Sequence, residues 1–199
     1  MFNSSPLNSK AINGQAGNSF ADWTQLLPIE RQAIYLLDIG DLRLPISSAQ
    51  ATMRKTGQSF LQVVVPNGDQ YINALDGLRG TVMELRSGYR YADDSLSPLE
   101  VIATAPYQLL ARNQGAINDT LTLSGYGTLP TASSRLRELA GVQTRTIDAD
   151  GKRRTRCEID LLLRPGHLAR DSDSVTFPVG VIQYFINAVS EAMEVMQDG

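Results

Sequence analysis

The segment 142–164, VQTRTIDADGKRRTRCEIDLLLR, constrains the fold more than any other, because it has the pattern of a β-hairpin. At its centre lies Asp150-Gly151, two residues that tolerate the positive φ angles of a tight two-residue turn. Beyond the turn, alternate residues are apolar, which indicates a strand with one dry and one wet side. The dry side is expected to hold Cys157, Ile159, Leu161 and Leu163, and the wet side Glu158, Asp160 and Arg164.

A two-residue turn at this point also fixes the register of the hairpin. The expected opposing pairs are Asp148 with Arg153, Thr146 with Thr155, Arg145 with Arg156, Ile147 with Arg154, and Val142 with Ile159. Two arginines placed opposite each other repel, so acidic groups are expected nearby. Asp148, Glu158 or a partner protein are the candidates.

Other segments extend the β prediction, because they are rich in β-branched residues or alternate in polarity. Strands are expected at 32–39, 43–54, 59–65, 99–105, 109–113 and 120–126, with a turn at 55–57 joining the second and third. Ser87-Gly88 predicts a further hairpin between 81–86 and 89–91. A short helix is expected within 67–77, capped by Asn67 or Asp69 and with Tyr71, Ile72 and Leu75 on one face.

The last part of the chain has two periodicities. Alternation over 175–181 indicates a strand, whereas the apolar residues of 182–193 also recur at helical spacing. We favour a long strand, a turn near Ser190-Glu191 and a final strand ending at Met196, with a helix from Gly180 to Met196 as the alternative. The segments 92–98 and 165–173 are expected to be loops, and 133–139, SSRLREL, a helical turn.

The first 25 residues are rich in Asn, Ser, Gly and Ala, with apolar residues thinly spaced. Such a segment cannot form a core of its own, which leaves two interpretations: a disordered tail, or an extended arm that docks onto neighbouring subunits. The arm would dock through Phe2, Leu7, Ile12, Phe20 and Trp23, the only tryptophan. The expected divisions are an arm at 1–31, a β-rich domain at 32–130 with a helix near 69–76, and a second β sub-structure at 131–199.

Composition excludes several classes of site. One cysteine and one histidine rule out an intrachain disulfide and any metal site that needs two histidines or a Cys/His cluster. The net charge of −3 gives no broad basic field, so no nucleic-acid contact is predicted. No apolar run reaches membrane-helix length and the N-terminus lacks a secretory pattern, so a chain folding in a cytoplasm is expected.

Candidate chemistry is sparse, and we predict no catalytic residue, metal or cofactor. Asp148-Ala149-Asp150-Gly151 resembles the start of a calcium loop, but the basic residues after it favour a simple turn. His167 is expected to be exposed and Cys157 to lie in the core. Four scattered acids could in principle form a hydrolytic pair, but surface positions are expected for them. These acids are Glu100, Glu138, Asp160 and Glu191.

Four basic residues follow the hairpin turn and form what we call the basic run: Lys152, Arg153, Arg154 and Arg156. Such a cluster can contact phosphate. No aromatic stacking pattern or excess of basic residues accompanies it, so a docking surface for another protein is the preferred interpretation.

Four stretches resemble small structural proteins of phage tails: FNSSPLNSKAING at the start, LRLPISSAQATMRKTGQSFLQVVV at 42–65, TLTLSGY at 120–126, and 153–195. In that order they are similar to tail hub or baseplate (distal tail) proteins of long-tailed, siphovirus-type bacteriophages. Some tail-tip proteins of this kind hold an iron–sulfur centre with a cysteine cluster, which Cys157 alone cannot do.

The resemblance implies a mainly β (α+β) fold, with antiparallel β-barrel or sandwich sub-structures, one or two short helices and the extended arm. It implies a non-enzymatic virion protein, made in the host cytoplasm, that forms a ring with copies of itself, a trimer being one arrangement. The ring would connect the tail tube to spike or fibre proteins. Two alternatives remain: a sugar- or cell-surface-binding β-sandwich using Tyr89, Tyr91, Asp93 and Asp94, and a tail-associated cell-wall hydrolase.

Overall fold

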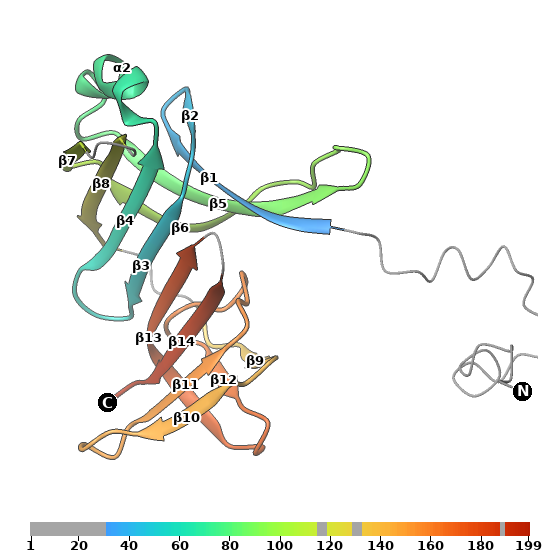
Figure 1. Cartoon of the computed structure of the whole chain (residues 1–199). Coiled ribbons are helices and arrows are strands. Elements are labelled where there is room, and N and C mark those ends of the chain that lie inside the picture. The colour runs from blue at the N-terminus through green and yellow to red at the C-terminus, as the bar shows by residue number, and fades with distance from the viewer. Residues whose placement is uncertain (1–30, 115–118, 129–132, 188–189) are drawn as a thin grey trace, which may run out of the picture.

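A computed structural model describes residues 31–114, 119–128, 133–187 and 190–199 (Figure 1). Apart from the backbone of Arg31, the predicted N-terminal arm lies outside the described residues. The fold is mainly β with antiparallel sheets and a short helix, as the sequence predicted. Of the two predicted architectures, the described strands form open, sandwich-like sheets and no closed barrel.

The smaller sheet has four strands in the order β2-β1-β5-β6. Its strands are β1 (Arg31–Ile39), β2 (Leu42–Pro45), β5 (Val82–Tyr91) and β6 (Glu100–Pro106). Apolar residues of neighbouring strands lie opposite one another, since Leu37 pairs with both Leu44 and Leu85. All three are completely buried. At the end of the predicted strand 32–39, the odd-numbered side chains therefore face the core.

The larger sheet runs β10-β11-β14-β13-β3-β4-β8-β7, and β12 and β9 extend from β13. Its strands are β3 (Ser48–Arg54), β4 (Ser59–Pro66), β7 (Leu109–Gln114), β8 (Asp119–Gly127), β9 (Leu136–Glu138), β10 (Thr144–Ile147), β11 (Arg153–Cys157), β12 (Leu168–Arg170), β13 (Thr176–Asn187) and β14 (Glu191–Gln197). Strands β9 and β12 pair in parallel.

The ambiguous C-terminal segment forms two antiparallel strands, so the preferred prediction is confirmed and the helical alternative is wrong. Alternate side chains of β13 (Ile182, Tyr184 and Ile186) are buried, which a strand between two neighbours achieves and an isolated helix cannot. Strand β13 also pairs with β3, so one sheet joins residues on both sides of the predicted boundary at 130. The division into two sub-structures stays a prediction.

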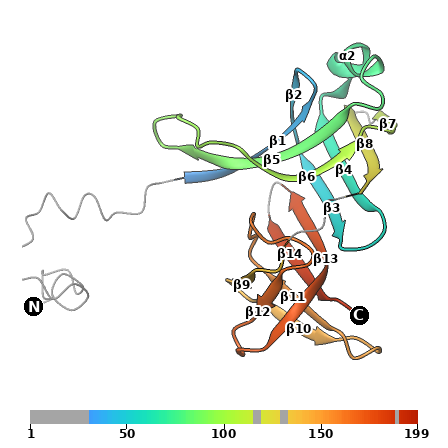
Figure 2. The same cartoon turned by 180° about the vertical axis from the view of Figure 1, so that it is seen from behind.

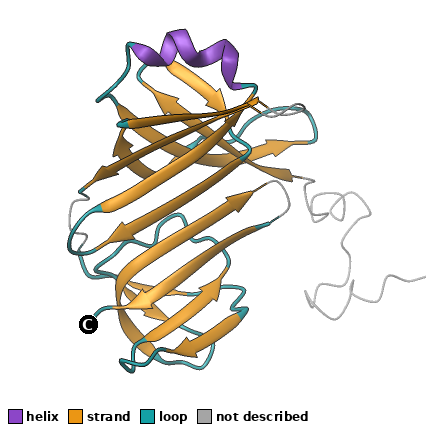
Figure 3. Ribbon diagram, turned by 60° about the vertical axis from the view of Figure 1, so that its left-hand side comes forward, coloured by secondary structure: helices purple, strands orange, loops and turns teal. Residues whose placement is uncertain are grey.

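The predicted helix is present as a short 3₁₀ turn, η1 (Gly68–Tyr71), followed by α2 (Ile72–Asp76). It lies across one end of the strands (Figure 3), and Leu75 of α2 is completely buried. Asn67 stands at the start of the 3₁₀ turn with φ 51°, but its side chain makes no capping hydrogen bond.

The predicted hairpin at Ser87-Gly88 is wrong, because β5 continues through it without a turn. Gly88 serves a different purpose, which is to let the segment 97–99 pass close to the strand. A Cβ atom at this position would lie 2.6 Å from Cδ2 of Leu99 and 2.9 Å from Oγ of Ser97. The glycine therefore marks a close approach between chain segments rather than a reversal.

Three further predictions in the second half need correction. The segment SSRLREL contains strand β9 rather than a helical turn, and the expected loop 165–173 contains β12. Each of these strands satisfies its backbone groups with the other, a long-range pairing that short segments do not reveal. The strand after the hairpin turn ends at Cys157, so Ile159 and Leu161 lie beyond the strand, although both pack against the core.

The two sheets share one hydrophobic core, and β6 of the small sheet contacts β4 and β8 of the large one. The start of β1, the end of β5 and the loop after it project away from this body (Figures 1 and 2). This ribbon overhangs the turn between β13 and β14, and the space between the two forms the groove described below.

Candidate functional site: a basic hairpin and an interaction groove

The hairpin of β10 and β11 closes with a three-residue loop rather than the predicted two-residue turn. The Asp148 N–H donates to the Lys152 carbonyl at 3.0 Å, and Gly151 adopts φ +76° between them. The Asp148 carboxylate accepts hydrogen bonds from the N–H groups of Asp150 (3.0 Å) and Lys152 (2.8 Å). This carboxylate therefore stabilises the loop, as expected for a turn rather than for a calcium site.

The longer loop shifts the register by one residue, so the predicted pairing is wrong. Arg145 faces Thr155 and not Arg156, which removes the expected repulsion between opposed arginines. The pairs observed are Thr144 with Arg156, Arg145 with Thr155, Thr146 with Arg154, and Ile147 with Arg153.

The basic run has acidic partners within the chain, but not Asp148 or Glu158. Arg153 lies 2.5 Å from Asp171, whose side chain is 0% exposed, and Arg154 lies 3.0 Å from Glu194 on β14. Arg156 donates to Gln143 at 3.2 Å and lies over the ring of Phe185.

Arg145, on the neighbouring strand, lies 3.3 Å from Asp173. Much of the charge of the hairpin is therefore balanced inside the molecule. That the basic run is a docking surface stays a prediction. Its main candidates are Lys152 and Arg154, and the Arg154 side chain is 47% exposed.

Three of the four scattered acids, Asp160, Glu138 and Glu191, each have a separate partner. Asp160 is held by Arg137 through two hydrogen bonds of 2.8 and 2.9 Å, and this contact helps keep the pKa of the carboxyl low against the opposing effect of burial. Glu138 pairs with Arg170, and Glu191 accepts from Tyr35. In the part of the chain that the structure describes, no three His, Cys, Asp or Glu residues gather in a way that could hold a metal ion.

His167 and Cys157 are both buried, so the prediction for the histidine is wrong and that for the cysteine is confirmed. His167 is 6% exposed, and its Nδ1 accepts the Arg164 backbone N–H at 3.3 Å. Burial, and then the positive charge of nearby arginines, lowers the pKa of this imidazole. Burial raises the pKa of the Cys157 thiol to about 12, so the thiol stays protonated and unreactive.

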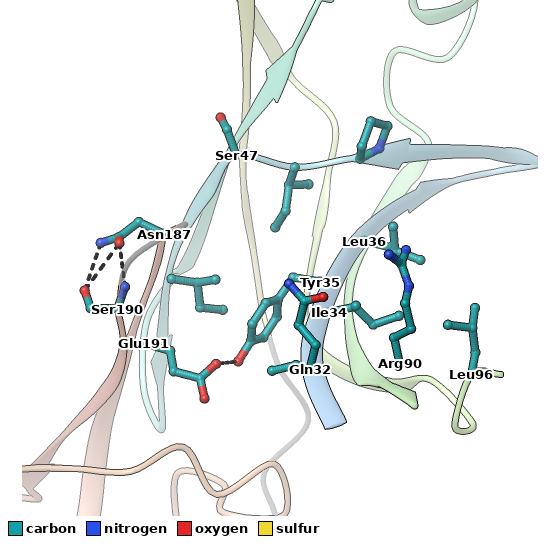
Figure 4. A pocket seen from close by; sticks show the side chains of 14 residues that line it. Gln32, Ile34, Tyr35, Leu36, Ser47, Arg90, Leu96, Asn187, Ser190 and Glu191 are labelled. Carbon is teal, nitrogen blue, oxygen red and sulfur yellow. Dashed lines mark hydrogen bonds between the residues drawn. The ribbon is translucent and has the colours of Figure 1, made fainter. Parts of the chain in front are cut away.

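A groove of about 600 Å³ lies between the small sheet and the β13–β14 turn (Figure 4). Strand β1 forms one wall, the residues before β3 form the end, and the β13–β14 turn forms the other wall. Its lining residues are Gln32, Ala33, Ile34, Tyr35, Leu36, Pro45, Ile46, Ser47, Arg90, Leu96, Ile186, Asn187, Ser190 and Glu191.

A hydrogen bond crosses this groove and ties its walls together. The Tyr35 hydroxyl on β1 donates to the Glu191 carboxylate on β14 (Figure 4). Burial, and then the hydrogen bond to Glu191, raises the pKa of Tyr35 well above its usual value, so the phenol remains a donor. On the same wall the Ser190 N–H donates to Oδ1 of Asn187 at 2.8 Å, which fixes the β13–β14 turn.

The groove also exposes an open strand edge. Strand β5 pairs with the whole of β1, whereas β2 pairs only with its second half, from Leu36 to Ile39. Along 32–35, no strand among the described residues pairs with the outer edge of β1. An open edge presents N–H and C=O groups that can bind another extended chain. Strand length alone does not reveal it, so the sequence analysis missed this site.

The residues considered for sugar binding lie on the projecting ribbon. The Asp93 carboxylate accepts hydrogen bonds from the N–H (3.0 Å) and hydroxyl (2.5 Å) of Ser95, and these contacts lower its pKa. Its Oδ1 atom therefore serves the turn after β5. This use of the carboxylate does not favour a sugar site here.

The fold is one that phage-type tail proteins share. No protein-family model matches the sequence, and neither does any curated protein. Among solved structures, the tail protein from Neisseria meningitidis MC58 is similar with a TM-score of 0.56 and 7% identity, over 84% of this chain and 97% of that one. The 43 kDa tail protein of prophage MuSo2 from Shewanella oneidensis is similar with a TM-score of 0.52 and 6% identity, over 84% of this chain and 98% of that one.

A third similar structure is an E. coli protein described as a component of the type VI secretion system with structural similarity to the T4 tail proteins gp27 and gp5. It has a TM-score of 0.51 and 7% identity, over 80% of this chain and 75% of that one. The resemblance to phage tail proteins is thus confirmed at the level of the fold, while the siphovirus type stays a prediction. No helix of the described residues is long and apolar enough to cross a membrane.

Proposed function

We propose that the chain is a non-enzymatic structural component of a bacteriophage-type tail, at the tail-tip hub or baseplate. The observation that carries the proposal is the fold, which extends over at least 80% of the chain in each of three tail or tail-like proteins. The separate partners of Asp160, Glu138 and Glu191 support a structural rather than a hydrolytic role.

We further propose that copies of the chain form a ring that connects the tail tube to spike or fibre proteins. The open strand edge and the groove beside it give each copy a surface suited to another chain. Two members of the basic run, the exposed Arg154 and the partly exposed Lys152, are proposed to contact a different tail protein.

Electron microscopy of intact tails, compared with the purified chain, tests this function. We expect a monomer in isolation and a ring of copies near the tail tip, with no cell-wall cleavage by the purified chain in a zymogram. Removing residues 1–25 should leave a folded protein that does not assemble. Normal assembly of the shortened chain would disprove the role of the arm, and a chain absent from tails would disprove the function itself.

A further inference from the structure

We propose that the groove binds the N-terminal segment of a second copy of this chain, which adds as a strand to the open edge of β1 and places Trp23 in the groove. This inference rests on the proposed assembly into a ring. It assigns an occupant to a surface of defined chemistry, and it identifies where the predicted arm binds.

The strand edge is the first argument. Over 32–35 the outer edge of β1 has no paired strand among the described residues, and it forms a wall of the groove. Extended peptides bind such edges through main-chain hydrogen bonds, while pockets beside the edge accept alternate side chains. An occupant of this groove is therefore an extended polypeptide rather than a helix or a small polar molecule.

The lining of the groove is the second argument. The lining combines the apolar side chains of Ile34, Leu36 and Leu96, which lie with Arg90 on one side of β1 (Figure 4), with the polar side chains of Gln32 and Ser47. Leu96 is 50% exposed, so an occupant of the groove would bury apolar surface against it. The segment 20–27, FADWTQLL, supplies matching chemistry, since apolar and polar side chains are mixed along it. A volume of about 600 Å³ is large enough for an indole together with neighbouring side chains.

The direction of β1 favours a second copy over the same chain. The strand starts at the far end of the projecting ribbon and runs inward, so the chain before Arg31 continues from a point that lies away from the body (Figures 1 and 2). Pairing with its own β1 would require a tight reversal. Of the residues between Trp23 and Arg31, TQLLPIE, only Pro28 favours turns, and none is a Gly, Asn or Asp that would tolerate the positive φ of a tight hairpin turn. Fully extended, they span about 26 Å, enough to cross to a neighbour.

Disulfide trapping in assembled tails tests the inference. One variant carries Thr24→Cys, beside an intact Trp23, and the other carries Leu96→Cys in the groove. Tails assembled from a mixture of the two are oxidised, and covalent dimers are measured. The matched control uses Leu162→Cys in place of Leu96→Cys. The Leu162 side chain is 60% exposed but does not line the groove. The native Cys157 is buried and should not react.

We expect a covalent dimer from Thr24→Cys with Leu96→Cys, at least tenfold more abundant than with Leu162→Cys. In unmodified protein, the emission of Trp23 should shift to shorter wavelength on assembly. Rings that form without this dimer, or with equal amounts for the control, would overturn the inference while leaving the proposed function intact. A further check uses one chain that carries both Thr24→Cys and Leu96→Cys. If its disulfide forms only within that chain at every dilution, the inference would be overturned too. Tails that contain no ring of this chain would overturn both.

Discussion

The basic hairpin and the groove are both rich in polar groups, yet they use them differently. In the hairpin, Arg153 reaches a fully buried Asp171, and Arg154 is paired with Glu194. In the groove, Tyr35 and Glu191 hold the walls together while a strand edge and the apolar surface of Leu96 stay open. A dense charge cluster in the sequence can thus be internal structure, whereas an open strand edge arises where pairing stops halfway along a strand.

The largest difference should come from the buried ion pair of the hairpin. We expect Arg153→Ala to lower the free energy of unfolding by about 2 kcal/mol, because it leaves the buried Asp171 carboxylate short of a partner. The matched variant Arg154→Ala should lower the free energy of unfolding by no more than about 0.5 kcal/mol, since the Arg154–Glu194 pair is partly exposed. Urea denaturation of both proteins measures the difference. Equal losses would show that burial of Asp171 does not make this part of the basic run structural.

A smaller effect should follow from crowding the strand that supports the groove. Gly88→Ala should lower the free energy of unfolding by about 1 kcal/mol, because its Cβ would lie 2.6 Å from Leu99 in the segment beside Leu96. Gly77→Ala is the control, since nothing lies within 4 Å of a Cβ there. Thermal unfolding of the two variants provides the comparison, and similar midpoints would contradict the close approach at Gly88.

Tyr35→Phe removes the hydrogen bond to Glu191 across the groove. It should lower the free energy of unfolding by about 1 kcal/mol, a typical value for one hydrogen bond. The effect should depend on pH. The raised pKa of Tyr35 means that the folded protein keeps this proton when the unfolded chain releases it, so stability falls as the pH rises above about 10. Tyr184 shares this behaviour, hence Tyr35→Phe should reduce the alkaline loss without abolishing it.

Denaturation at pH 8 and at pH 10.5 measures the effect of Tyr35→Phe. Tyr126→Phe is the control at pH 8, where it should leave the stability unchanged, because this ring is exposed and lies tilted against Phe60. An alkaline loss of the same size in Tyr35→Phe and in the unmodified protein would rule out the protonated bond.

The smallest effect concerns His167, in the half of the molecule that carries the hairpin. Its pKa is lowered in the folded state, so the unfolded chain binds a proton first as the pH falls. Stability that is complete above the usual histidine pKa of about 6.5 should therefore decline towards pH 5. The variant His167→Gln should lose this decline, as denaturation at pH 7.5 and pH 5.5 can measure. A decline of equal size in the variant would assign it to the carboxylates instead.

The sequence predicted most strands because their signal is local. The alternation of β13 and the β-branched run of β4 depend on nearest neighbours only, and both are present. Predictions failed where a distant segment decides. Gly88 faces residues 97–99, β9 exists only because it pairs with β12, and His167 is buried by neighbours that a Pro-Gly loop does not disclose.

The candidate site was harder to predict than the fold. The basic run was correctly located on the hairpin, but its partner Asp171 could not be identified, because a one-residue shift of register changes which groups face each other. The groove was missed, since it depends on β2 pairing with only half of β1. Glu191 was considered only as a possible catalytic acid, while in the structure it accepts the Tyr35 hydrogen bond.

The claim that the groove, rather than the basic hairpin, joins copies of this chain is tested most directly by a cryo-electron microscopy map of intact tails. The account predicts a ring in which each groove holds an extended segment of the adjacent copy, paired along residues 32–35 of β1, with the Trp23 indole against Leu96. Grooves that face solvent in a complete ring, with adjacent copies joined instead through Lys152 and Arg154, would contradict it.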